Sequence, residues 1–214
     1  MDTRRLRREF IALARRLQRP GSGSTVAFLE GRSAQMRVPN LTDVLGPLPW
    51  AVVGAVATRL YMPERATQDL DIAVRVEDAS EVRRRLSDAG FAHQGELSIG
   101  GSSWRSPGGV IVDVLEVSEP WFAQALAEAG RNRDAQGLPV LPLPYLALMK
   151  FQAGRVQDLA DVTRMLGQAN DETPDLVRRL FSQYSGGDLE HLESLIQLGQ
   201  LEMRPPPAGG GSVS

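Results

Sequence analysis

Residues 50–76 read WAVVGAVATRLYMPERATQDLDIAVRV, and their pattern predicts a strand, a tight turn, a short helix, a loop and a second strand. Two acids, Asp69 and Asp71, stand at the start of the second apolar run. Alternate side chains of a strand point to the same face, so we expect both carboxylates to point one way. Paired carboxylates at the start of an apolar strand are costly unless something neutralises them, and a divalent metal, often with phosphates, is the usual partner.

A third acid, Asp113, interrupts the later apolar run at residues 110–115 (VIVDVL). A strand this apolar rarely carries an unpaired acid. Glu116 competes for the same role, but alternation places it on the face opposite Asp113. The three acids together predict a metal site, against the simpler interpretation of exposed acids beside a turn.

The turn before the short helix predicts a phosphate contact. Gly54 leaves the backbone open to a phosphate near the helix N-terminus, although taken alone it fits a simple tight turn better. Arg59 and Arg65 flank the segment and could contact a triphosphate or an acidic substrate, or be ordinary surface arginines. We expect Thr67 to hydrogen-bond the backbone near Asp69 and to shape the loop.

Length and composition limit the class of protein that the chain can form. The 214 residues, with a net charge of −2 and 42% hydrophobic residues, fit a soluble globular protein with one core, or one core and a small helical domain. The absence of cysteine excludes disulfides and thiolate metal sites. No run approaches the ~20 apolar residues of a membrane span, and the first residues lack the apolar core of a signal peptide. We therefore expect a cytoplasmic protein with no membrane partner.

Residues 3–17 are predicted to form a helix with an apolar stripe and an opposite basic face. The basic face suggests an RNA-phosphate or partner surface, or else a solvated arginine face on a packed helix. Residues 25–38 are expected to form a short hairpin. The stripe comprises Leu6, Phe10, Leu13, Ala14 and Leu17, and the basic face comprises Arg4, Arg5, Arg7, Arg8, Arg15, Arg16 and Arg19.

The rest of the chain alternates helical and strand patterns. A predicted strand at 91–97 leads through two glycines to residues 102–105, and a turn at 107–109 returns the chain as a hairpin strand at 110–117. Trp104 could stack on a base or belong to the core, and His93 is expected to pack or to face solvent. Predicted helices cover 79–88, 120–129, 145–153, 175–184 and 189–198, a short edge-like strand covers 138–141, and the tail 204–214 is expected to be disordered.

In this order, the strand, the glycine turn opening a helix, the Asp-x-Asp motif and the later third acid resemble the nucleotidyltransferase fold related to DNA polymerase beta. More narrowly, residues 65–71 (RATQDLD) resemble the AbiEii-like nucleotidyltransferases, toxins of bacterial type IV toxin–antitoxin and phage-defence systems. The resemblance covers roughly residues 48–166. It implies an α/β (α+β) fold, with a small mixed, mostly antiparallel sheet flanked by helices and a helical C-terminal region.

The resemblance also implies roles for the acids. Asp69, Asp71 and Asp113 would hold two Mg²⁺ ions, one activating the attacking oxygen and the other steadying the triphosphate of an NTP. The implied catalytic set is Asp69, Asp71, Asp113 and Asp158, and the implied nucleotide-binding set is Gly54, Ala55, Arg65, Thr67 and Lys150.

Two parts of the chain differ between the resemblance and the residues taken alone, or from the usual family pattern. The resemblance places Lys150 on the nucleotide phosphates and gives Asp158 or Asp161 a supporting or base role, whereas the residues alone fit an exposed helix lysine and a first-turn acid. The family usually has Gly-Ser or Gly-Gly where this chain has Gly54-Ala55. Ala55 lacks the phosphate-holding hydroxyl but keeps its backbone N–H.

The function implied is Mg²⁺-dependent transfer of a nucleoside monophosphate from an NTP to an acceptor hydroxyl, with RNA such as tRNA as acceptor and a cognate antitoxin protein as partner. Alternatives are a small-molecule enzyme of the aminoglycoside-modifying kind and an inactive antitoxin or binding module; Ala55 slightly favours the module, and the acid trio opposes it. The predicted regions are a basic helix and hairpin (1–40), a nucleotidyltransferase core (41–141), a helical region (142–203) and the tail (204–214).

Overall fold

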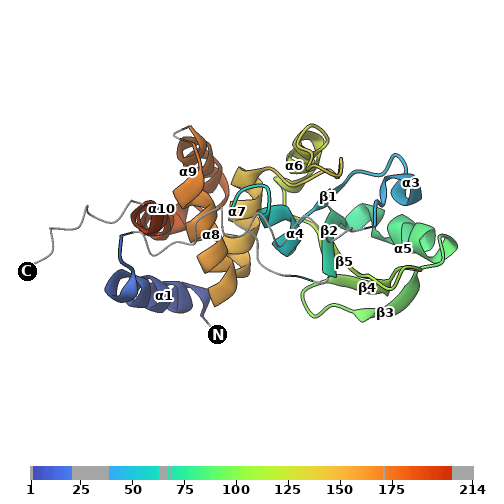
Figure 1. The fold of residues 1–214 in the computed structure, drawn as a ribbon, viewed down its shortest axis with the longest axis horizontal. Helices are drawn as coiled ribbons and strands as arrows, with labels where there is room; N and C mark the ends of the chain where they lie inside the picture. The colour runs from blue at the N-terminus through green and yellow to red at the C-terminus, as the bar shows by residue number, and fades with distance from the viewer. Residues whose placement is uncertain (1, 21–38, 63–66, 68, 171, 204–214) are drawn as a thin grey trace, which may run out of the picture. The chain divides into compact units, whose positions relative to one another are not determined.

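The structure is a computed structural model that describes residues 2–20, 39–62, 67, 69–170 and 172–203 (Figure 1). The chain divides into two compact units: residues 27–142 form one, and residues 1–26 with 143–214 form the other. The hairpin predicted at 25–38, Arg65 and the tail at 204–214 lie outside the described residues.

The first unit is built on a five-stranded sheet with the order β1-β2-β5-β4-β3. The β2–β5 pair is parallel and the other three pairs are antiparallel, which confirms the predicted small mixed, mostly antiparallel sheet. The strands are β1 (Trp50–Val52), β2 (Asp69–Arg75), β3 (Ala92–Glu96), β4 (Gly101–Arg105) and β5 (Ile111–Val117).

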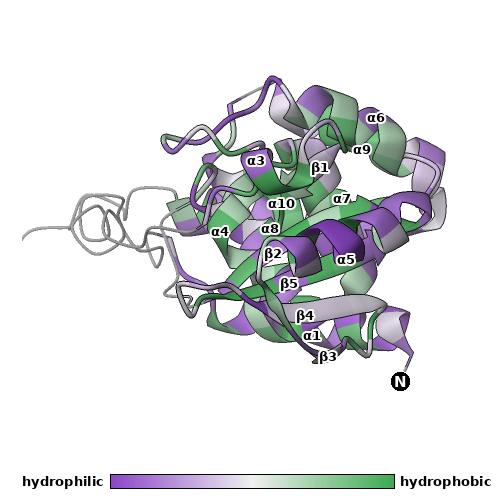
Figure 2. Cartoon of the chain, turned by 90° about the vertical axis from the view of Figure 1, so that its right-hand side faces the viewer, coloured by the Kyte–Doolittle hydropathy of each residue, from purple (hydrophilic) through white to green (hydrophobic). Residues whose placement is uncertain are grey.

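Helices flank this sheet. Val82 and Leu86 of α5 are fully buried, whereas the visible side of α5 is mostly hydrophilic (Figure 2). An amphipathic helix of this kind buries its apolar stripe against a core. The helices are α3 (Thr42–Leu45), α4 (Gly54–Thr58), the 3₁₀ turn η1 (Val76–Asp78), α5 (Ala79–Asp88) and α6 (Phe122–Ala129).

The short strand predicted at 138–141 is reduced to isolated pairing with β1. Val52 N–H donates to the Pro139 carbonyl (2.7 Å), and Leu141 N–H donates to the Val52 carbonyl (3.1 Å). Val140 makes the only β1 bridge of this segment among the described residues. Proline has no N–H to give to a ladder, so the segment borders the sheet without extending it as a strand.

The second unit is helical. Its α7 is mostly hydrophobic and mostly buried (Figure 2). The helices are α1 (Thr3–Leu17), α7 (Leu143–Ala153), α8 (Val156–Gln168), α9 (Thr173–Tyr184) and α10 (Leu189–Met203), with the 3₁₀ turn η2 (Gly186–Asp188) before α10. None of the described helices has the length and apolar character needed to cross a bilayer.

The predicted bounds of α1 are confirmed, but burial does not follow its predicted apolar stripe and basic face. Leu13 and Leu17 are 57% and 69% exposed, whereas Arg7 is buried. The Arg7 guanidinium lies 4.0 Å from the centroid of the Phe151 ring and 3.1 Å from the Asp188 carboxylate. A ring face and a carboxylate together make burial of an arginine favourable, which the helical periodicity of α1 alone does not reveal.

Helix α10 runs five residues beyond its predicted end because two glycines meet where it crosses α8. A Cβ added to Gly167 would lie 2.7 Å from Gly199 Cα, and one added to Gly199 would lie 2.8 Å from Gly167 N. The predicted helix ended at 198, and a glycine such as Gly199 often ends a helix. Here Gly199 instead permits close contact between two helix backbones.

We expect Gly167→Ala and Gly199→Ala each to lower the free energy of unfolding by about 1–3 kcal/mol, because the added methyl forces the two backbones apart. Thermal denaturation monitored by far-UV circular dichroism measures the change. Gly186→Ala is the control, because a Cβ there meets nothing within 4 Å; it should alter stability by no more than about 0.5 kcal/mol. Equal effects of all three substitutions would contradict the close crossing.

Candidate active site

Three carboxylates share one face of the sheet, which we call the acid face. Asp71 lies opposite Asp113 in the parallel β2–β5 pair, and Asp69 lies opposite Ile111. Because side chains alternate along a strand, the three acids point to the same side, whereas Leu70 between them is fully buried on the other. All three acids are half-buried. The structure thus brings Asp69, Asp71 and Asp113 to one surface.

The turn between β1 and α4 lies directly against Asp71. Val53 N–H donates to the Asp71 carbonyl (2.9 Å), and Gly54 has φ of 64°. A Cβ on Gly54 would lie 2.5 Å from Asp71 Cγ, so glycine is required by the backbone conformation and by the close approach of the carboxylate. The methyl of Ala55, the next residue, is buried.

Asp113 has an unsatisfied oxygen. Its Oδ1 atom is buried and accepts no hydrogen bond from any described residue. A buried carboxylate oxygen without a donor is costly, and two carboxylates facing each other across adjacent strands repel. A cation bound beside Asp71 and Asp113 would relieve both costs.

Asp69 has a local partner in the loop before β2. The Thr67 hydroxyl donates to Asp69 Oδ1 and lies 3.5 Å from the Asp69 carbonyl, in the position expected of a residue that shapes the loop. Among the described residues, no three Asp, Glu, His or Cys side chains are grouped so that they could hold a metal ion. Carboxylates suit Mg²⁺. However, of the three predicted ligands only Asp71 and Asp113 lie opposite each other, while the Asp69 carboxylate accepts a hydrogen bond from Thr67.

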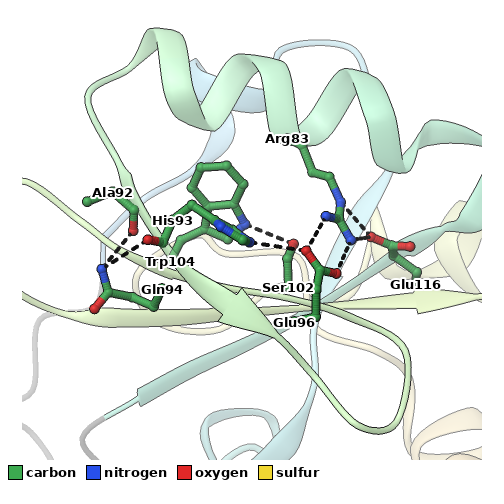
Figure 3. A network of polar contacts seen from close by, with 8 residues as sticks. All are labelled: Arg83, Ala92, His93, Gln94, Glu96, Ser102, Trp104 and Glu116. Atoms are coloured by element: carbon green, nitrogen blue, oxygen red, sulfur yellow. Dashed lines mark hydrogen bonds and ion pairs between the residues drawn. The ribbon is translucent and has the colours of Figure 1, made fainter.

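The other face of the sheet carries a network of ion pairs and hydrogen bonds beneath α5 (Figure 3). Arg83 reaches from α5 to Glu96 of β3 (2.7 Å) and to Glu116 of β5 (2.7 Å). The Arg83 guanidinium holds the pKa of Glu96 below its usual range. The prediction that Glu116 lies on the face opposite Asp113 is confirmed.

Trp104 and His93 belong to this second face too (Figure 3). Trp104 is 5% exposed, donates from Nε1 to Ser102 Oγ (2.9 Å), and meets the His93 ring edge-on at a centroid distance of 5.0 Å. It is therefore the core tryptophan of the simpler interpretation and does not face the acids.

The remaining predicted residues lie in other places. Arg65 is outside the described residues, and Arg59 is half-buried at the C-terminal end of α4. Lys150 and Asp158 belong to the helical unit. There, Lys150 Nζ lies 3.2 Å from Asp158 Oδ1 and 2.9 Å from Asp161 Oδ2.

This charge cluster joins α7 to α8 and is deeply buried. Lys150, Asp158 and Asp161 are 6%, 3% and 1% exposed, so the exposed-lysine interpretation is wrong. Arg155 Nε also donates to Asp158 Oδ2 (2.6 Å), and Gln157 Nε2 donates to Asp161 Oδ1 (3.0 Å). Lys150 is the single lysine of the sequence, and its ammonium is already shared between two carboxylates.

The sequence patterns did not predict two further residues of the acid face. Ser103 lies opposite Asp113, and Arg105 lies opposite Ile111 in the antiparallel β4–β5 pair. The available signal was the strand alternation counted back from Asp113 through the turn predicted at 107–109. Hydrogen bonds between Ser106 and Val110 close this turn and set the register.

Gly54→Ala should displace the Asp71 carboxylate, because the new methyl would occupy its position. Gly137→Ala is a matched control, since Gly137 also has a left-handed φ (79°) but a Cβ there meets nothing within 4 Å. Both variants carry the strain of about 1–2 kcal/mol for a left-handed non-glycine residue. Thermal denaturation should show a larger loss for Gly54→Ala, and equal losses would contradict the contact with Asp71.

Lys150→Met should lower the free energy of unfolding by about 3–5 kcal/mol, because it leaves two buried carboxylates without their shared cation. Adding Asp161→Asn to Lys150→Met should recover part of that loss, since one of the uncompensated charges is removed. Urea denaturation of the single and double variants measures both effects. Unchanged stability of Lys150→Met would show that the lysine is not structural and would favour its assigned role on phosphate.

Comparisons with known proteins give fold-level likeness only. No protein-family model matches the chain, and no curated protein matches it. A solution structure of the antibiotic-resistance factor ANT(2″)-Ia is 16% identical, with a TM-score of 0.44, over 90% of this chain and 100% of that one. A putative nucleotidyltransferase from Thermotoga maritima is 16% identical (TM-score 0.38; 60% of this chain, 91% of that one). A CCA-adding enzyme in complex with CTP is also 16% identical (TM-score 0.38; 86% and 52%).

Proposed function

We propose that the acid face binds Mg²⁺ and an NTP and transfers a nucleoside monophosphate to an acceptor hydroxyl, with RNA as the acceptor. The observation that carries the proposal is the register that sets Asp71 opposite Asp113, on a half-open face, with the Gly54 turn against Asp71. Opposed carboxylates with an unsatisfied buried oxygen suit a hard divalent cation. The narrower likeness to toxin-type enzymes rests on residues 65–71.

In this proposal Asp71 and Asp113 are the principal metal ligands, and Asp69 joins them by exchanging its contact with Thr67. Bound Mg²⁺ supplies positive charge that offsets the charge developing on the triphosphate. Phosphate oxygens would be received by the backbone N–H groups of Gly54 and Ala55, because the Ala55 side chain offers no donor.

The reaction forms a bond from the acceptor oxygen to the α-phosphorus of the NTP. The bond between that phosphorus and the oxygen bridging to the β-phosphate breaks, and pyrophosphate leaves. The acceptor proton is proposed to leave to solvent water, since the free Asp113 Oδ1 is taken here as a ligand of the metal. Lys150 and Asp158 were assigned to phosphate and to a supporting or base role, but their charges are mutually satisfied and buried. Their part in transfer stays a prediction that the Lys150→Met experiment addresses.

A second candidate is a binding module built on the same scaffold. It is favoured by two observations: Ala55 lacks a hydroxyl, and no three ligand side chains of the described residues are grouped as a metal site. A small-molecule acceptor of the aminoglycoside type is the remaining enzymatic alternative, and it differs from the main proposal only in the acceptor.

Transfer is tested by incubating the protein with Mg²⁺ and each α-labelled NTP in turn, with total RNA, an aminoglycoside or the protein itself as acceptor. Asp71→Asn and Asp113→Asn should each reduce labelling of RNA by at least about 100-fold, because each removes charge stabilisation from the transition state. Glu116→Gln is the control, because Glu116 lies on the same strand but on the opposite face. NTP binding by calorimetry, with and without EDTA, provides a readout that needs no acceptor.

The outcomes separate the candidates. RNA labelling that fails in both aspartate variants but persists in Glu116→Gln would support the proposal. Transfer to the aminoglycoside alone would identify a small molecule, and not RNA, as the acceptor. No transfer and no Mg²⁺-dependent NTP binding would leave the binding module.

A further inference from the structure

The acid face continues past Asp113 across the outer strands β4 and β3, where the sequence predicted no site. The β4–β5 register places Ser103 beside Asp113, and it places Arg105 in the same cross-strand row as Ile111 and Asp69. With strands about 4.8 Å apart, Arg105 begins roughly 10 Å from Asp69 across the sheet. A molecule seated on the Asp71–Asp113 pair and extending toward β3 would therefore pass over Ser103 and beside Arg105.

The bulge in β3 removes negative charge from this part of the acid face. The β3–β4 register shifts between His93 and Gly95, so His93 and Glu96 both point to the α5 side although they are three residues apart. Figure 3 shows both side chains on the side of Arg83. Without the shift, alternation would place one of the two on the acid face.

The charges of these strands are consequently divided between the two faces. In β3, β4 and β5, the carboxylates other than Asp113 are Glu96 and Glu116, and both are paired with Arg83 on the α5 side. Arg105 is exposed, and the one side-chain hydrogen bond of its guanidinium to a described residue is a long one, from Nη2 to Gln94 Oε1 (3.4 Å). Its guanidinium forms no ion pair with the described residues.

We propose that Arg105 selects a polyanionic acceptor, the phosphodiester backbone of single-stranded RNA, for the site on the acid face. An arginine fork matches a phosphate in charge and geometry. A polycationic amino sugar would need carboxylates at this place, and the outer strands present none on the acid face beyond Asp113. This inference rests on the function proposed above, because it names the residue that would select the acceptor at that same site.

The test uses the full chain and a 5′-fluorescein single-stranded RNA, with binding measured by fluorescence anisotropy over a range of salt concentrations. Arg105→Gln should weaken binding and reduce the slope of log K against log salt by about 1, the value expected when one phosphate contact is lost. Arg131→Gln is the matched control, because Arg131 is an exposed arginine of the same unit that belongs to none of the five strands. Its slope should equal that of the unmodified protein.

A second measurement separates this inference from the proposed function. Arg105→Gln should leave Mg²⁺-dependent NTP binding unchanged while raising the KM for RNA in transfer, and Arg105→Glu should raise that KM further. If the unmodified protein shows no Mg²⁺-dependent NTP binding, the proposed function is overturned. The slope of log K against log salt would still decide whether Arg105 contacts RNA. Equal slopes for Arg105→Gln and Arg131→Gln, or labelling of kanamycin in preference to RNA, would overturn the selection of a polyanion.

Discussion

The parallel pairing of β2 with β5 is the constraint on which the rest of this molecule depends. Its register sets Asp71 opposite Asp113 and buries Leu70 and its neighbours on the other side. A slip of one residue would exchange the faces, placing acids in the core and leucine in water. The β1–α4 turn reinforces the register, because Gly54 leaves room for the Asp71 carboxylate and for no additional carbon.

The sheet also places paired charges on one of its faces and the carboxylates of the proposed site on the other. On the α5 side, Arg83 draws two glutamates together and holds the pKa of Glu96 below its usual range, so this carboxylate stays charged as the pH falls through the ordinary glutamate range. The ion pair stabilises the fold above that range and is lost in stronger acid. On the acid face, Asp113 Oδ1 accepts no hydrogen bond from the described residues and is left for a ligand. Stability and the proposed chemistry thus depend on different charges of the same strands.

Local patterns predicted what depends on neighbours in the sequence. The 15-residue α1, the strand alternation at Asp69 and Asp71, and the placement of Glu116 all follow from period and composition. What failed depends on distant partners. Arg7 is buried because Phe151 and Asp188 meet it, and Gly199 continues a helix because Gly167 faces it. Ser103 escaped notice because the register of a hairpin depends on turn hydrogen bonds that its composition does not fix.

The buried position of Lys150 has a consequence for the whole surface. Since the sequence has no other lysine, every positively charged side chain on the exterior is a guanidinium, apart from any protonated histidine. Guanidinium groups keep their charge at any pH a cell reaches and are not substrates for acetylation. The only other primary amine belongs to the chain terminus. Lysine acetylation, which controls the charge of lysine-rich surfaces, would consequently leave the charge of this exterior unchanged.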